Sequence, residues 1–70
     1  MISQALFVFA SSPAARLFVK ALVQDLDFVA ILVLDETVIV IDGGTAEGQS
    51  QGERIRQLAR SSGERQATWR

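Results

Sequence analysis

Apolar residues gather in three short segments of this chain, and each segment predicts a β-strand: residues 2–10, 28–34 and 37–41. In the first, side chains alternate between the two faces of a strand, so Phe7 and Phe9 oppose Leu6 and Val8. Both sets are apolar. We therefore expect both faces of this strand to be covered.

The second and third segments flank Asp35-Glu36, which predicts a β-hairpin. With a two-residue turn, Leu34 pairs with Thr37, and the register then carries Asp42 opposite Val29. Both faces of the hairpin are again apolar, and Val33 and Val40 share one of them.

A helix is predicted between the first two strands. Ser12 is the expected N-cap and Pro13 the first helical residue, because proline lacks the N–H that would have no partner there. The helix is expected to end near Asp25. Its polar residues form one narrow stripe, and apolar residues fill the remaining surface, so we expect it to contact more than its own sheet.

A second helix is predicted over residues 51–62. Ser50 and Glu53 match a capping box, and Gly63 is placed to end the helix. The seam that would face the sheet is thin. It consists of Ile55, Leu58, Ala59 and Ser62.

The predicted order is β-α-β-β-α, an α+β fold with a three-stranded sheet and two helices. This is the split β-α-β arrangement of ferredoxin-like folds without the last strand. Residues 1–63 form the predicted domain, and residues 64–70 a C-terminal tail. Two helices can cover one face of such a sheet, so the other face and the edge of the first strand are expected to stay open.

Composition favours association as the way to close these surfaces. The chain has 70 residues, of which 49% are hydrophobic, and it contains neither cysteine nor histidine. Disulfides and the commonest zinc ligands are therefore not available to support so small a domain. We expect a homo-oligomer, a dimer in the simplest case, or docking on a partner protein. The predicted interface residues are Phe7, Phe9, Phe18, Val33, Val40 and Trp69.

The charges are divided along the chain. Residues 1–52 carry two cations against six acids, a balance of −4, and residues 53–70 carry five cations against two acids, a balance of +3. Arg54, Arg56 and Arg60 lie on the second predicted helix and are the candidates for contact with nucleic acid. The acidic body argues against that partner, which we keep as an alternative.

A glycine-rich loop follows the third strand. Gly43, Gly44 and Thr45 are candidates for phosphate binding, because backbone N–H groups between a strand and a helix can surround an anion. The segment from Asp42 to Thr45 resembles the Asp-Gly-Gly-Thr phosphate loop of actin-like and sugar-kinase ATPases. That resemblance covers four residues, and those enzymes need two large domains.

Two acids are candidate metal ligands. The hairpin register makes Asp27 a diagonal neighbour of Asp42, and clustered carboxylates can bind Mg²⁺ or Ca²⁺. Carboxylates at strand ends also commonly face solvent. No catalytic residue is predicted, because the chain has no His, Cys or Tyr to activate a serine, and Lys20 lies on the polar stripe of the first helix.

The sequence therefore predicts a non-enzymatic protein–protein interaction module without a cofactor, either a small homo-oligomer or an accessory subunit. One alternative is a small nucleic-acid-binding regulator. Another is a metal- or phosphate-dependent enzyme assembled between subunits. We expect a cytoplasmic protein without a membrane span, because no apolar run approaches the ~18 residues that a span needs.

Overall fold

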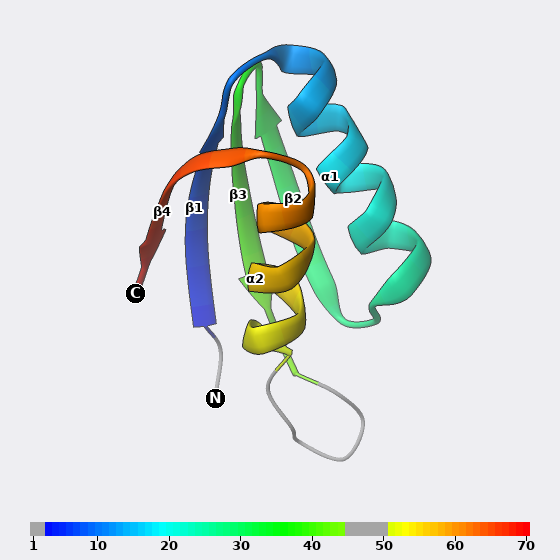
Figure 1. The fold of residues 1–70 in the computed structure, drawn as a ribbon. Coiled ribbons are helices and arrows are strands. Elements are labelled where there is room, and N and C mark those ends of the chain that lie inside the picture. The colour runs from blue at the N-terminus through cyan, green and yellow to red at the C-terminus, as the bar shows by residue number, and fades with distance from the viewer. Residues whose placement is uncertain (1–2, 45–50) are drawn as a thin grey trace.

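The computed structural model describes residues 3–44 and 51–70, which form two helices and four strands (Figure 1). In chain order the elements are β1 (Ser3–Phe9), α1 (Ser12–Asp25), β2 (Val29–Leu34), β3 (Thr37–Asp42), α2 (Gly52–Ser61) and β4 (Glu64–Trp69).

The four strands form one antiparallel sheet in the order β2-β3-β1-β4. This is the full ferredoxin-like topology, so the prediction of a three-stranded sheet lacking the last strand was wrong. The predicted tail, residues 64–70, contributes β4, which pairs with β1. Beyond the strand, the backbones of Gln4 and Arg70 exchange two further hydrogen bonds. The edge of β1 expected to stay open is thus closed by the chain itself.

The hairpin register agrees with the prediction. Leu34 pairs with Thr37, and Asp42 lies opposite Val29. The turn is made possible by Asp35, whose φ of 55° lies in the left-handed region that aspartate tolerates better than most residues. Since this register fixes which side chains share a face, the composition of each face follows from it.

Both helices begin one residue away from the predicted position. Ser11, not Ser12, is the N-cap of α1, and its hydroxyl accepts a hydrogen bond from the amide of Ala14. In α2 the N-cap is Gln51, without a side-chain capping bond. Ser50 of the predicted capping box lies outside the described residues. Gly63 follows α2 with a φ of 84°, so the predicted glycine stop is confirmed.

The two helices lie side by side on one face of the sheet (Figure 1). Phe18 of α1 fills the space beneath them, with its ring 5.1 Å from that of Phe7 and 5.0 Å from that of Phe9. On the outer side of α1, Leu17 and Val23 are exposed in the single chain. The expectation that this helix contacts more than its own sheet stays a prediction for that side.

Candidate functional site

The face of the sheet opposite the helices is apolar over three of its four strands. The register places one row of side chains from each strand there, because every second residue points to the same side. Leu32, Leu34 and Ile41 are 54%, 56% and 41% exposed. We call this surface the open face; its apolar members are Leu6, Val8, Ala30, Leu32, Leu34, Ile39 and Ile41.

The open face becomes polar towards β4. Gln66 and Thr68 continue the rows of Val8 and Leu6 onto that strand. Next to them, a hollow of about 240 Å³ is lined by Gln4, Leu6, Thr68 and Arg70. The surface is therefore one apolar area with a polar margin on one side, which is the usual composition of a protein–protein interface.

The two edges of the sheet are protected to different degrees. The outer strand β4 has the sequence ERQATW, and its pairing with β1 is interrupted by a register shift between Val8 and Phe9. Polar residues and bulges of this kind discourage pairing with other chains. The other outer strand, β2, has the sequence VAILVL and none of these features. The exposed apolar surface thus reaches from the centre of the open face to the edge of β2.

Most of the predicted interface residues lie on the helix side of the sheet. Phe7, Phe9, Phe18 and Val40 belong to the buried core of the single chain, so their burial requires no second chain. Val33 shares this side and is 41% exposed. The exposed apolar side chains of the sheet lie mainly on the other face, because the helices cover the phenylalanine side. The interface role of Val33 stays a prediction.

Trp69 docks within its own chain. Its ring and that of Phe7 pack edge to face, with 5.7 Å between ring centroids, and the guanidinium of Arg56 lies over the tryptophan ring, 4.8 Å from its centroid. The prediction of a docked Trp69 assigned it to a neighbouring subunit or a partner protein. The described contacts are intramolecular and hold β4 against β1 and α2.

Asp42 binds backbone and side-chain N–H groups of its own chain. The carboxylate is 2% exposed, and it accepts hydrogen bonds from the amides of Gly44 (2.8 Å) and Gln51 (2.9 Å) and from Nε2 of Gln51 (3.2 Å). The same Nε2 donates to the backbone carbonyl of Asp27, whose side chain is exposed. Asp42 therefore joins the end of β3 to the start of α2.

These contacts bear on the metal and phosphate candidates. The part of the chain that the structure describes contains no group of three or more His, Cys, Asp or Glu side chains arranged to bind a metal. The amides of Gly43 and Gly44 donate to the carbonyl of Phe28 and to Asp42, so neither is directed towards a bound anion. Thr45 lies outside the described residues.

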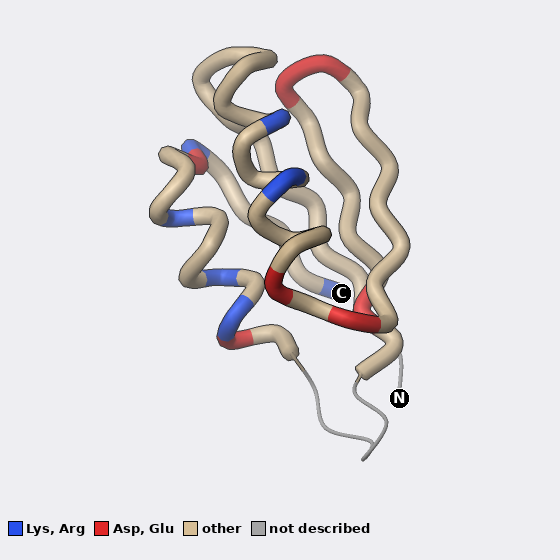
Figure 2. Tube along the Cα trace, turned by 90° about the vertical axis from the view of Figure 1, so that its right-hand side faces the viewer, with Lys and Arg blue, Asp and Glu red and all other residues tan. Residues whose placement is uncertain are grey.

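The three candidate arginines are placed differently from one another. Arg54 forms an ion pair with Asp25, and this hydrogen bond together with the charge attraction raises the pKa of the Arg54 side chain. Arg56 stacks on Trp69, and Arg60 is exposed. Two of the three thus hold intramolecular contacts. Figure 2 shows the cations spread along both helices instead of gathered in one patch.

Comparison of the chain with models of protein families, with curated proteins and with solved structures finds no match. Neither of the two helices in the described residues is long and apolar enough to span a membrane. Any functional conclusion therefore depends on the geometry of the surfaces described above.

Proposed function

We propose that this protein is a non-enzymatic interaction module that docks another polypeptide on the open face of its sheet. The observation that carries the proposal is the exposure of Leu32, Leu34 and Ile41 at the centre and margin of that face. Fully burying one such side chain contributes ~1.5–3 kcal/mol, so covering the exposed halves of all three contributes roughly 3 kcal/mol.

Enzymatic chemistry is not part of the proposal. The sequence lacks His, Cys and Tyr, and the buried carboxylate of Asp42 accepts hydrogen bonds that hold the backbone. Nucleic acid is the less favoured partner, because Arg54 and Arg56 hold intramolecular contacts and the open face carries no aromatic residue for base stacking. We retain the cytoplasm as part of the proposal.

The test compares two leucine-to-aspartate variants. Leu32 lies on the open face and Leu17 on the outer side of α1, and they are 54% and 64% exposed. Both substitutions leave a hydrated carboxylate on the free chain, so both variants are expected to fold. Leu32→Asp should abolish association or precipitation of the wild-type chain, because covering an unpaired charge costs several kcal/mol. Leu17→Asp should behave as wild type.

The measurement is sedimentation of the full chain, with circular dichroism as the check on folding. A wild-type chain that assembles or precipitates, and a Leu32→Asp variant that stays at the monomer mass of 7.6 kDa, support the proposal. If the wild-type chain is a soluble monomer and neither substitution changes its behaviour, the open face is not a docking surface.

A further inference from the structure

Charged residues frame the open face at the ends of its two outer strands. Asp27 precedes β2, and Asp35 and Glu36 follow it. The sequence has no Lys or Arg between residues 21 and 53, so this half of the sheet has no cations of its own. Arginines occupy the two ends of β4, Arg65 near its start and Arg70 directly after it.

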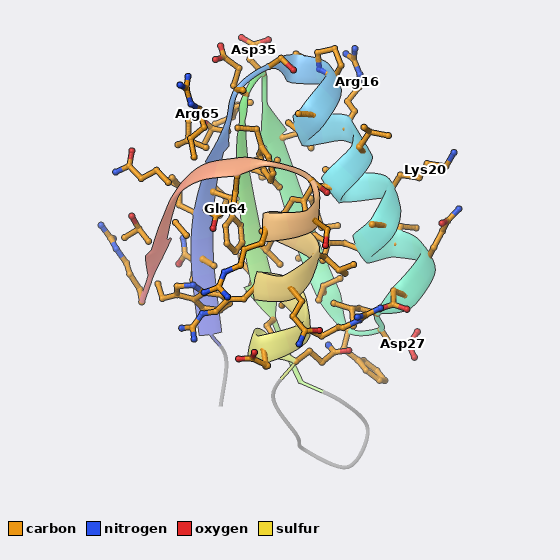
Figure 3. The ribbon with its side chains drawn as sticks, in the orientation of Figure 1. Arg16, Lys20, Asp27, Asp35, Glu64 and Arg65 are labelled. Atoms are coloured by element: carbon orange, nitrogen blue, oxygen red, sulfur yellow. The ribbon has the colours of Figure 1, made fainter. Side chains whose placement is uncertain are left out.

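The acids and the arginines lie at matching ends of the sheet. The register brings the start of β2 to the same end as the close of β4, because Val29 and Trp69 both lie at the Ser3–Ala5 end of β1. In Figure 3, Asp27 is at the lower end of the molecule, and Asp35 and Arg65 are at the upper end. Arg70 lines the hollow on the open face. Acids therefore mark both ends of one outer strand, and the other outer strand has an arginine near each end. Glu64, the first residue of β4, pairs with Phe9 and so shares the helix side of the sheet.

We infer that the polypeptide docked on the open face is a second copy of this chain. The two copies are related by a two-fold axis that lies in front of the open face, parallel to the strands and midway between β1 and β3. This inference rests on the proposed function. Such an axis exchanges the left and right sides of the sheet and keeps each strand end at its own end. It places β3 over the partner's β1 and β2 over the partner's β4. Glu36 then faces the partner's Arg65, and Asp27 faces the partner's Arg70.

Apolar contacts fill the middle of this arrangement. The axis keeps each residue at its own height along the strands, so Ile39 of β3 lies over Leu6 of the partner's β1, with Thr37 over the partner's Val8 and Ile41 over the partner's Gln4. The reciprocal contacts follow from the symmetry. Packing of two sheets in this way separates them by about 10 Å, with interdigitated side chains between. Leu32 and Leu34 of β2 then lie over Thr68 and Gln66 of the partner's β4 and pack on their aliphatic groups. The hydroxyl and amide of those two residues lie at the rim, in contact with water.

The available area is sufficient for a dimer of moderate affinity. Four strands spaced about 4.8 Å apart and six residues long cover about 390 Å² per copy, or about 780 Å² for two copies. Side-chain relief increases the accessible area above this flat value, to roughly the 1,000 Å² at which specific interfaces begin. We therefore expect a dissociation constant in the micromolar range.

Edge-to-edge pairing through β2 is the competing arrangement for two copies. An antiparallel pair of β2 strands would bring Asp27 of one copy close to Asp35 and Glu36 of the other. At both ends of the paired β2 strands, acids of the two copies would repel one another and oppose this pairing. In face-to-face packing, acids of one copy face arginines of the other. Edge pairing would also leave the apolar open face of both copies exposed to solvent.

The experiment is a charge exchange in the full chain, followed by sedimentation equilibrium over a range of concentrations. Glu36→Arg and Arg65→Glu should each raise the dimer dissociation constant about tenfold, because the two-fold axis repeats each rim pair. The double variant should return it close to the wild-type value. Lys20→Glu is the matched control, since it makes the same charge change as Arg65→Glu on the helix side of the molecule, and it should leave dimerisation unchanged.

A salt titration of the wild-type chain is a second measurement that needs no variant. Added salt should weaken the dimer by screening the rim pairs. A dimer of twice 7.6 kDa with rescue by the double variant sustains the inference.

A dimer that neither charge reversal weakens overturns the inference. A wild-type chain that precipitates, while Leu32→Asp is soluble, assigns the open face to a different protein; that result overturns the second copy and leaves the proposed function standing. A wild-type monomer that Leu32→Asp does not alter removes both.

Discussion

Replacement of Asp42 tests whether its carboxylate stabilises the fold or binds a ligand. In Asp42→Ala the buried backbone amides of Gly44 and Gln51 lose the carboxylate that accepts their hydrogen bonds. Nε2 of Gln51 still donates to the backbone carbonyl of Asp27, at 2.6 Å. Each stranded buried donor costs ~1–3 kcal/mol, so we expect a loss of about 3 kcal/mol in the free energy of unfolding. For a domain of this size the total is only roughly 4–10 kcal/mol.

Thermal and urea unfolding followed by circular dichroism, at one fixed protein concentration, measure this loss. A change of 1 kcal/mol shifts the Tm of a small domain by ~4–8 °C, so Asp42→Ala should lower it by at least about 12 °C. Asp42→Asn should be nearly as damaging, because its amide group places a donor against donors. Asp27→Asn is the control, since only the backbone carbonyl of Asp27 takes part in the cluster. It should stay within ~0.5 kcal/mol of wild type.

Two results would refute this account of Asp42. One is an Asp42→Ala variant as stable as the wild-type chain, which would mean that the three hydrogen bonds contribute nothing. The other is a loss of wild-type stability on adding a metal chelator, because a ligand that binds the folded state stabilises it. The second result would return Asp42 to the role of metal ligand.

Two further predictions concern the C-terminal segment. Deleting residues 64–70 should unfold the chain, because β1 loses one of its two strand neighbours and Phe7 loses its contact with Trp69. A truncated chain with wild-type far-UV circular dichroism would show that β4 is dispensable. Gly63→Ala should cost ~1–2 kcal/mol in urea unfolding, since the φ of 84° is strained for any side chain although a Cβ would meet no atom within 4 Å. Gly63→Asn should cost less, because asparagine tolerates the left-handed region, and equal losses for the two variants would point to a cause other than backbone strain.

Local patterns in the sequence determine most of the elements. β-branched and aromatic residues mark β1, β2 and β3, and a two-residue turn is enough to set the register of the hairpin down to the pairing of Asp42 with Val29. Serine and proline start α1, and Gly63 ends α2. These features depend on neighbours within a few residues, so they can be predicted without knowing the tertiary fold.

The fourth strand is decided by the tertiary structure. The segment ERQATW has no apolar alternation, and four of its six residues are exposed. It becomes a strand because the free edge of β1 offers unpaired backbone groups, and because Phe7 and Arg56 provide a place for Trp69. No periodicity in the segment itself carries this information.

Which face of the sheet is buried is also a tertiary outcome. Both rows of β1 are apolar, so the pattern alone does not say whether the phenylalanines or Leu6 and Val8 lie under the helices. The position of Phe18 on α1 decides it, since its ring packs between Phe7 and Phe9. Because two helices cover only one face, the sequence determined that apolar surface would be left over, and the packing determined that it is the aliphatic face, framed by acids at one edge and arginines at the other.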